Sequence, residues 1–439
     1  MNVAITQTND LSVPRNKVVS ASIASVLGWS LDLFDLFVLL YVAPVVGALF
    51  FPSSNPTLSL ASVYASFAVT LLMRPVGSGI FGSYADRNGR KKAMTVAVTG
   101  VGFSTAILGV LPTVHQVGAL APILFLMFRL VQGVFVGGVV ASTHTIGTET
   151  VAPKWRGFMS GLVGGGGAGI GSLFASIVYL IVSNIFTGDQ FNVWGWRFMF
   201  FAGILCSILG LFVFKSLEES PLWAQQRAHE QQQTAPKAPV RTVFSGQYLP
   251  IVLVNLLIVL GGGAAYYLTS GFLPTFLKVV NKISHNASSG ILIEASFVAI
   301  FSAMLFGYLS DFTGRKKMFI ILGILCLIGL PLSYIGLAHA TSLGMISLYA
   351  LILAFLGNAA YAPILIYLNE RFPTAIRSSG TGLSWNMGFA IGGMMPTFVS
   401  LASGSTGNIP HTLVYFSIGI FILYLIGSFV TPETKGNLH

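Results

Sequence analysis

The chain has 439 residues, of which 54% are hydrophobic and 8% carry a charge, whereas about a quarter of the residues in a typical soluble protein are charged. The core of a water-soluble protein cannot hide so much apolar surface. The composition therefore excludes an ordinary soluble protein and indicates a protein that lies in a lipid bilayer. The net charge of +10 would suit a nucleic-acid partner, but its distribution along the chain excludes that class.

Apolar stretches long enough for a membrane-spanning helix, about 20 residues, follow one another along the chain. The first is too long for a cleaved signal peptide and contains two aspartates, so we expect it to be retained. We predict an all-α membrane protein with twelve spans at residues 20–50, 58–83, 93–111, 119–148, 157–184, 194–215, 248–277, 287–310, 318–338, 342–369, 379–403 and 410–431. Residues 1–215 and 248–439 are expected to form two six-helix bundles, joined by a cytoplasmic linker at residues 216–247.

Four charged residues lie near the middle of the first, second and fourth predicted spans: Asp32, Asp35, Arg74 and Arg129. A charge at the centre of a bilayer costs at least about 2.5–3.5 kcal/mol, so such residues usually serve a function. Asp32 and Asp35 share one helix face because they are three residues apart, and two carboxylates in a low-dielectric site cannot both ionise easily. We therefore expect this pair to carry a coupling proton. Glu294 of the eighth span is a further proton-coupling candidate, as a cavity-facing acid or an outer gate.

The two intramembrane arginines are expected to bind an anionic substrate, because the guanidinium fork can hold a carboxylate through two parallel hydrogen bonds. Protonation of the aspartate pair, with a substrate anion on Arg129 or Arg74, would leave the loaded site close to neutral. The alternative is a static network of ion pairs that ties the three spans together. This alternative weighs most for Arg74, which precedes Pro75 and lies near the motif at residues 82–92.

An eleven-residue motif occurs twice, as residues 82–92 and, 225 residues later, as residues 307–317. Both copies read Gly-x-x-x-Asp-x-x-Gly-Arg-Lys-Lys between apolar stretches, which indicates two related halves. We expect each copy to form a short loop whose Asp pairs with a facing Arg or with the positive end of a neighbouring helix; for the basic residues, a role in topology alone is the alternative. The expected gating residues, which include a second repeated pair after the fourth and tenth spans, are Asp86, Arg90, Glu149, Arg156, Asp311, Arg315, Glu370 and Arg377.

Most of the 23 lysines and arginines lie at the two termini and in every second loop between the predicted spans. Basic residues of membrane proteins gather on the cytoplasmic side. We therefore expect a multi-pass protein of the plasma membrane, in a bacterium the inner membrane, with both termini and the linker in the cytoplasm.

The spans of the second half carry polar and aromatic residues in place of charges. Such groups can orient a small polar solute, and the three glycines at 261–263 would loosen the seventh span toward a cavity. For each residue taken alone, hydrogen bonding between helices is at least as good an explanation. The substrate-binding candidates of this half are Asn255, Tyr266, Tyr267, Asn358, Tyr361, Trp385 and Asn386.

Three features resemble motifs of the major facilitator superfamily, and the resemblance to that superfamily extends over essentially the whole chain. They are the duplicated motif, Arg129-Leu-Val-Gln-Gly-Val-Phe-Val-Gly in the fourth span and Glu218-Glu-Ser-Pro-Leu-Trp after the sixth. More finely, residues 28–35, 72–77 and 153–158 resemble the sialate/lactate–proton symporter branch. Residues 50–53 and the Met-Arg-Pro segment at 73–75 also resemble the metabolite–proton symporter branch. The resemblance implies two bundles around a central cavity, working by alternating access, and a transporter rather than an enzyme.

Both branches are dominated by organic carboxylates, so we expect proton-coupled symport of a small organic anion, foremost a monocarboxylate such as lactate or pyruvate. The alternatives are di- and tricarboxylates, sialate or aromatic acids, a zwitterionic or cationic solute such as betaine, and, more remotely, a non-transporting sensor. We expect no cofactor or metal besides the coupling proton, no nucleic acid and no obligate protein partner, so that the protein works as a monomer in the bilayer.

Overall fold

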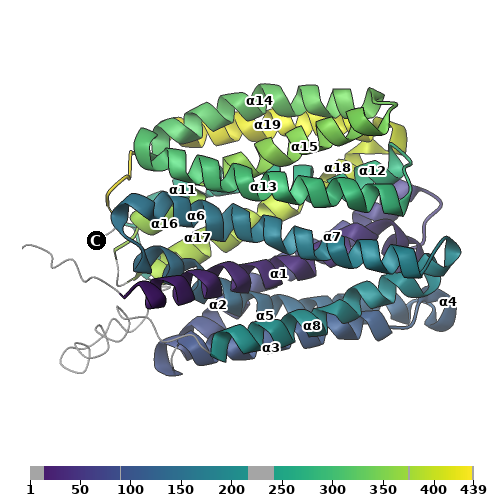
Figure 1. Ribbon diagram of the computed structural model, residues 1–439, viewed down its shortest axis with the longest axis horizontal. Helices are drawn as coiled ribbons and strands as arrows, with labels where there is room; N and C mark the ends of the chain where they lie inside the picture. Colours follow the sequence, from purple (N-terminus) through teal and green to yellow (C-terminus); the bar gives the residue numbers. More distant parts are fainter. Residues whose placement is uncertain (1–13, 89, 216–241, 374–375, 438–439) are drawn as a thin grey trace, which may run out of the picture.

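The computed structural model describes residues 14–88, 90–215, 242–373 and 376–437, and among these every regular element is a helix (Figure 1). Ten segments are long and apolar enough to cross a membrane. The shorter apolar helix at residues 94–110 and the helix pair at residues 377–403 account for the third and eleventh spans. The predicted all-α architecture of twelve spans is thereby confirmed. Residues 216–241 of the expected linker lie outside the described residues.

The first half contains α1 (Arg15–Phe50), α2 (Pro56–Asn88), α3 (Arg90–Val110), the short α4 (Val114–Val117) and α5 (Leu120–Thr150). The fifth and sixth spans follow as η1 (Pro153–Trp155), α6 (Arg156–Gly161), η2 (Leu162–Gly166), α7 (Gly167–Ile185), η3 (Phe191–Gly195) and α8 (Trp196–Lys215). These bounds agree with the predicted spans to within a few residues, except that α2 and α3 reach further toward each other.

The second half contains α11 (Leu249–Tyr266), η4 (Tyr267–Gly271), α12 (Leu273–Val279), α13 (His285–Thr313), α14 (Arg315–His339) and α15 (Leu343–Tyr361). It ends with α16 (Ile364–Glu370), α17 (Arg377–Gly393), α18 (Met395–Ser403), η6 (Thr406–Asn408) and α19 (Ile409–Val430). The repeated motif was predicted to form a short loop, and this is wrong for the second copy. It continues α13 to Thr313 and resumes in α14 at Arg315, so that Gly314 alone makes the turn, with a positive φ of 91° that favours glycine.

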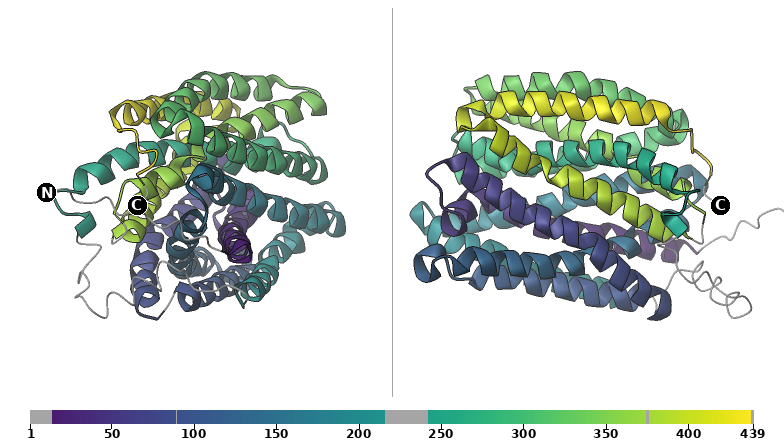
Figure 2. Two further views of the ribbon diagram at one scale, coloured as in Figure 1. Left: turned by 60° about the vertical axis from the view of Figure 1, so that its left-hand side comes forward. Right: turned by 180° about the vertical axis from the view of Figure 1, so that it is seen from behind.

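Two layers of helices meet along the middle of the molecule. In Figure 1 most of the first half lies below and most of the second half above, with α6 and α7 packed against α13. Seen from behind in Figure 2, α2 lies alongside α17 and α18. The start of α1 and the C-terminal residues lie at the same end of the bundle.

Glycines bring the two halves into backbone contact where α6 crosses α13. A Cβ atom on Gly161 would lie 2.1 Å from the backbone oxygen of Ala303, and one on Gly307 would lie 2.5 Å from the backbone oxygen of Gly157. Small residues let membrane helices approach this closely. The glycine-rich stretch after residue 160 therefore serves helix packing.

Candidate functional site

The four intramembrane charges predicted to act together do lie together, in the core of the first half. All four are almost completely buried, with Arg129 1% exposed and Asp35 5% exposed. Arg74 of α2 donates to Asp32 of α1 across 3.5 Å, while the other carboxylate oxygen of Asp32 has no hydrogen-bond partner. Asp32 is thus held on one side only, which leaves an acceptor free in the core.

Asp35 and Arg129 are joined through a residue that the sequence analysis did not single out. Arg129 donates from Nη1 to the side-chain oxygen of Gln132, one turn further along α5. The side-chain nitrogen of Gln132 donates to both carboxylate oxygens of Asp35, at 2.7 and 2.6 Å. Thr105 of α3 donates its hydroxyl to the same carboxylate. Three helices therefore converge on Asp35, and Gln132 separates it from the guanidinium.

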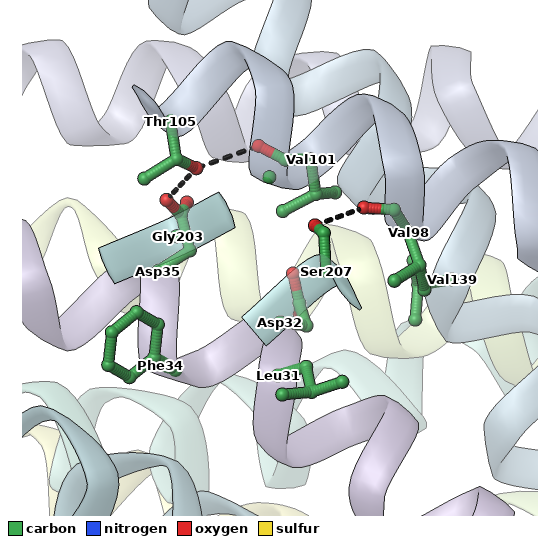
Figure 3. A pocket seen from close by; sticks show the side chains of 11 residues that line it. Leu31, Asp32, Phe34, Asp35, Val98, Val101, Thr105, Val139, Gly203 and Ser207 are labelled. Carbon is green, nitrogen blue, oxygen red and sulfur yellow. Dashed lines mark hydrogen bonds between the residues drawn. The ribbon is translucent and has the colours of Figure 1, made fainter. Parts of the chain in front are cut away.

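A small cavity of about 10 Å³ borders both aspartates (Figure 3). It lies between α1, α3, α5 and α8, and Thr105 and Ser207 supply hydroxyl groups to a lining that is otherwise mostly apolar. Figure 3 shows the carboxylate of Asp35 turned toward Thr105. The volume suits about one water molecule. In this conformation the space beside the aspartates is therefore too small for a solute.

Aromatic side chains fill the interface between the halves beside these charges. Trp29 of α1 packs edge-on against Trp385 of α17, with ring centroids 5.8 Å apart. Trp385 stacks on Phe389 at 4.6 Å, and Tyr361 lies 5.3 Å from both. Tyr266 then stacks on Tyr361 at 5.6 Å. All five side chains are at most 2% exposed. We call Trp29, Tyr266, Tyr361, Trp385 and Phe389 the aromatic cluster.

The aromatic cluster reaches the charged residues through two further rings. Tyr267 lies 6.1 Å from Phe389 and 5.4 Å from Phe67 of α2. The guanidinium of Arg129 lies 5.7 Å from the centroid of Phe67. One continuous path of side-chain contacts thus leads from the buried arginine to the centre of the interface.

Several buried polar atoms around this path have no hydrogen-bond partner. They are Nε and Nη2 of Arg129, the hydroxyl of Tyr266, Oδ1 of Asn358 and Oδ1 of Asn386. The amide nitrogens of Asn358 and Asn386 do bond, to Ser270 at 3.1 Å and, across the interface, to Ser78 at 3.0 Å. Tyr266 and Asn358 also line a second cavity of about 10 Å³ between α1, α7, α13 and η4. Buried groups left unpaired cost free energy, so these are the atoms that a bound solute or water would satisfy.

Two predicted site residues lie elsewhere. Asn255 accepts hydrogen bonds from Tyr367 at 2.9 Å and Arg371 at 3.3 Å, and donates to Ser384. It therefore links helices, about 16 Å along its helix from Tyr266. Glu294 is exposed and accepts from Ser347 of α15 at 2.6 Å, so in this conformation it borders neither cavity.

At the end of the bundle where the chain termini lie, an acidic residue connects the two halves. Asp311 of α13 accepts from the backbone nitrogens of Gly157 and Phe158, at 2.9 and 3.1 Å, at the start of α6. A carboxylate at a helix N-terminus is favoured by the helix dipole. Arg315 holds Asp311 at 3.0 Å and binds both oxygens of Glu370 at 3.2 Å. Asp311 thus meets both partners that the sequence suggested, a helix end and an arginine.

The remaining gating candidates are only partly described. The side chains of Asp86, Arg90, Glu149 and Arg377 lie outside the described residues, so their pairing stays a prediction. Arg156 is half-buried at the start of α6. The expected pairing of Glu370 with Arg377 is untested, whereas the observed partner of Glu370 is Arg315.

The segment after α19 contacts the start of α14 and Glu370. Glu433 accepts from the backbone nitrogens of Arg315 and Lys316, at 2.8 and 3.2 Å, at the start of α14. Thr434 donates to Glu370 at 2.8 Å. Burial alone would raise the pKa of Glu433, but backbone N–H donors, including those of Lys435 and Arg315, hold this pKa below its ordinary value of 4.5. A sequence scan for charges within spans missed Glu433 because it follows the last span.

Contacts between the halves are present at the opposite end of the bundle as well. Tyr64 of α2 shares a hydrogen bond with Thr275 of α12 at 2.7 Å, and Asn55 donates to the backbone of Gly404 at 3.0 Å. Tyr179 of α7 bonds to His285 of α13. Among the described residues, hydrogen bonds therefore join the two halves at both ends of the bundle.

The residues within the spans that sequence reasoning missed share one property: they are neutral. Gln132 lies three residues after Arg129 and on the same helix face, and Thr105, Trp29 and Phe389 are uncharged members of other spans. A search for intramembrane charges passes over them. The spacing of Gln132 from Arg129 was the one signal that could have drawn attention to it.

Comparison with known proteins supplies the family. The family model described as Major Facilitator Superfamily matches residues 18–396. The chain is 29% identical over 422 residues to the glycine betaine/proline/ectoine/pipecolic acid transporter OusA of Dickeya dadantii, covering 94% of this chain and 82% of that protein. It is 29% identical over 431 residues to the proline/betaine transporter of Escherichia coli K12, covering 96% and 84%.

A solved structure resembles the fold. The proton:xylose symporter XylE bound to 6-bromo-6-deoxy-D-glucose superposes with a TM-score of 0.76 at 16% identity, covering 96% of this chain and 97% of that one. At this identity the likeness concerns the fold alone. None of the proteins named here is described as a carrier of lactate or pyruvate.

Proposed function

This chain belongs to the major facilitator superfamily and is a multi-pass secondary transporter rather than an enzyme, and on that basis we propose that it couples proton flow to the transport of a small zwitterion of the betaine or proline type. The juxtaposition of an arginine that has free donors with a buried aromatic cluster is the observation that supports this proposal best. The names of the two relatives point the same way.

The aromatic cluster suits the positive end of such a solute. A quaternary ammonium group has no N–H to donate, and it is recognised by the faces of Trp, Tyr and Phe rings through cation–π attraction. The cluster supplies two Trp, two Tyr and one Phe from both halves. The unpaired carboxylate oxygen of Asp32 adds a negative charge nearby.

Arg129 suits the negative end. Its Nε and Nη2 are buried without partners, and an arginine fork binds a carboxylate with two hydrogen bonds. Phe67 and Tyr267 connect this fork to the aromatic cluster. In the closed conformation the rings pack on one another, so the solute would enter when the halves rock apart at one end.

A monocarboxylate such as lactate, which we expected from the sequence, would use only the arginine. Nothing in lactate needs five converging aromatic side chains, and a betaine uses both features. The proton remains the proposed coupling ion, carried on the pair Asp32 and Asp35, and the proposal needs no other cofactor. A bacterial inner membrane with both termini in the cytoplasm is proposed from the distribution of basic residues, and the two ends of the described chain lie on one side of the bundle.

Uptake by purified protein in liposomes tests this proposal. We expect an inward proton gradient to drive accumulation of radiolabelled glycine betaine or proline, and excess unlabelled betaine to compete while lactate does not. Accumulation of lactate that betaine fails to inhibit would contradict the zwitterion and restore the monocarboxylate. Absence of all proton-dependent uptake, with solute exchange intact, would contradict the coupling ion.

A matched pair of variants tests the aromatic cluster. Trp385→Leu removes a ring face and should weaken betaine binding by about 0.5–2 kcal/mol, the range of a cation–π contact. Trp385→Phe keeps a face and should retain most of the affinity. Equal losses in the two variants would show that bulk rather than aromatic character matters at this position.

A further inference from the structure

Gln132 lies between the arginine and an aspartate of the proposed transport site and contacts both. Its side-chain oxygen accepts from Arg129, and its side-chain nitrogen donates to both oxygens of Asp35. We propose that the orientation of the Gln132 side-chain amide couples occupancy of Arg129 by a substrate carboxylate to protonation of Asp35. This inference rests on the proposed function and adds a positioning residue to it.

The amide has only one orientation that fits these neighbours. A guanidinium offers donors and no acceptor, so the oxygen of the amide must face Arg129. The NH₂ group must then face Asp35. Gln132 is fully buried, so its amide cannot turn toward bulk solvent. Arg129 thereby fixes which end of the amide Asp35 meets.

In this orientation the amide offers Asp35 donors and no acceptor. The carboxylate accepts from the Gln132 nitrogen and from the Thr105 hydroxyl, and an added proton would face donors on these sides. The other charged groups near Asp35 among the described residues are Arg129 of α5, Arg74 of α2 and Asp32 of its own helix. The helices α3 and α8 contribute the hydroxyls of Thr105 and Ser207 to the shared cavity.

A substrate carboxylate on Arg129 would release the amide. The carboxylate binds Nε and Nη2, and as the guanidinium turns toward it, Nη1 moves away from Gln132. The Gln132 oxygen then loses its partner and the amide can rotate. The oxygen then accepts a hydrogen bond from protonated Asp35. Substrate binding thus strengthens proton binding, and by reciprocity the proton strengthens substrate binding. This is the coupling that a symporter requires.

The test is Gln132→Leu in the full-length protein. The Leu side chain is of comparable bulk, ends one atom short of the amide oxygen and nitrogen, and has neither donor nor acceptor. Protonation of Asp35 is followed as the acid-dependent carboxyl band in infrared difference spectra that disappears in Asp35→Asn. In the wild type we expect glycine betaine to raise the proton affinity by about 5- to 150-fold, the usual range of coupling between two sites, and in Gln132→Leu by less than about twofold.

Transport provides the second readout. Gln132→Leu should still exchange internal for external betaine but should lose accumulation driven by a proton gradient. Wild-type accumulation in this variant, or an unchanged effect of betaine on the carboxyl band, would overturn the inference. Loss of exchange and accumulation in equal measure, in a variant that melts at the wild-type temperature, would also overturn it, because a coupling residue must separate the two. Ser104→Ala is the matched control, since Ser104 bonds only to its own helix.

A third variant separates this inference from the proposed function. Arg129→Met frees the amide permanently without any substrate, and it should raise the proton affinity of Asp35. In the Gln132→Leu background, Arg129→Met should raise the proton affinity of Asp35 by less, because no amide is present to rotate. Equal shifts in both backgrounds would refute the role of Gln132. If the wild type binds no zwitterion but the two shifts differ, the proposed substrate is contradicted. The proposed role of Gln132 then stands.

Discussion

The two buried aspartates lie one turn apart in sequence but have different surroundings. Asp35 is surrounded by hydrogen-bond donors from α3 and α5, whereas Asp32 has one partner, Arg74, and one free oxygen. Their shared helix face is a property of the sequence. Their different partners follow from which helices pack against that face.

Asp35→Asn should abolish accumulation driven by a proton gradient while leaving exchange of betaine across the membrane. Asparagine keeps the shape and a hydrogen-bonding oxygen for Gln132 and Thr105, but it cannot bind and release a proton. Radiolabelled uptake with and without an imposed gradient measures both activities. Undiminished accumulation would refute a proton role for this residue.

Arg129→Lys should raise the concentration of betaine needed for half-maximal exchange roughly ten- to hundredfold. Lysine keeps the charge but lacks the planar fork, so at least one charge-assisted hydrogen bond, worth about 1.5–3 kcal/mol, is lost. Exchange rates measured over a range of betaine concentrations test this. An unchanged half-maximal concentration would mean that the carboxylate binds elsewhere.

At the scale of elements, the spans that meet at the interface are interrupted. The fifth and seventh spans contain the π-helical turns η2 and η4, and the tenth breaks between α15 and α16. Such interruptions often lie at functional sites because they free backbone groups and allow bending. Tyr267 begins η4 and Tyr361 ends α15, so aromatic residues of the proposed site lie where their helices are interrupted.

The segment after α19 stabilises the start of α14 through Glu433. The pKa of this carboxyl is lowered in the folded protein. Its contribution to the free energy of unfolding is therefore fully present at pH values above the ordinary pKa of 4.5, and it is lost as the pH falls through the lower pKa of the folded state. Glu433→Gln should therefore lower thermal stability at neutral pH, by about 0.5–2 kcal/mol if it acts as a helix cap does. The difference from the wild type should vanish in acid. Melting curves at neutral and acid pH check this, and a constant difference would contradict it.

At the scale of the whole molecule, the two halves are held together at both ends. Asp311 accepts from the start of α6 at the end proposed to face the cytoplasm, and Tyr64 bonds to Thr275 at the opposite end. Alternating access requires one of these sets to break while the other persists. The balance between the two ends should therefore respond to single substitutions.

Asp311→Asn should shift the protein toward the form open at its inner end. Weakening one charge-assisted contact by about 1.5–3 kcal/mol changes such an equilibrium tenfold or more. A cysteine at Ser160, which bonds across the interface to the backbone of Ala362, should then react faster with a membrane-impermeant maleimide in inside-out vesicles, in a background without the native cysteines. A cysteine at Thr275 in the outer seal should react more slowly from outside. Unchanged rates at both positions would show that Asp311 does not control the gate.

Much of the fold could be predicted from sequence because its causes are local. A bilayer requires apolar stretches of a given length, so the twelve spans and their approximate bounds follow from hydropathy. The duplicated motif indicates two related halves before any packing is known. The sequence also predicts that the four intramembrane charges lie close together, because charged residues at the same depth of a membrane usually pair with one another. They are Asp32, Asp35, Arg74 and Arg129.

The partners of these residues depended on the tertiary structure. Which helices face one another is decided by packing between segments far apart in the chain, and this brought neutral Gln132 between Arg129 and Asp35. It also placed Trp29 of the first half against Trp385 of the second, moved Asn255 into a contact between helices and left Glu294 at the surface. Sequence alone determined the kind of protein and the depth of its charges, because these depend on transfer from water to lipid. The tertiary structure decided the site, because a site consists of contacts between helices that no local pattern encodes.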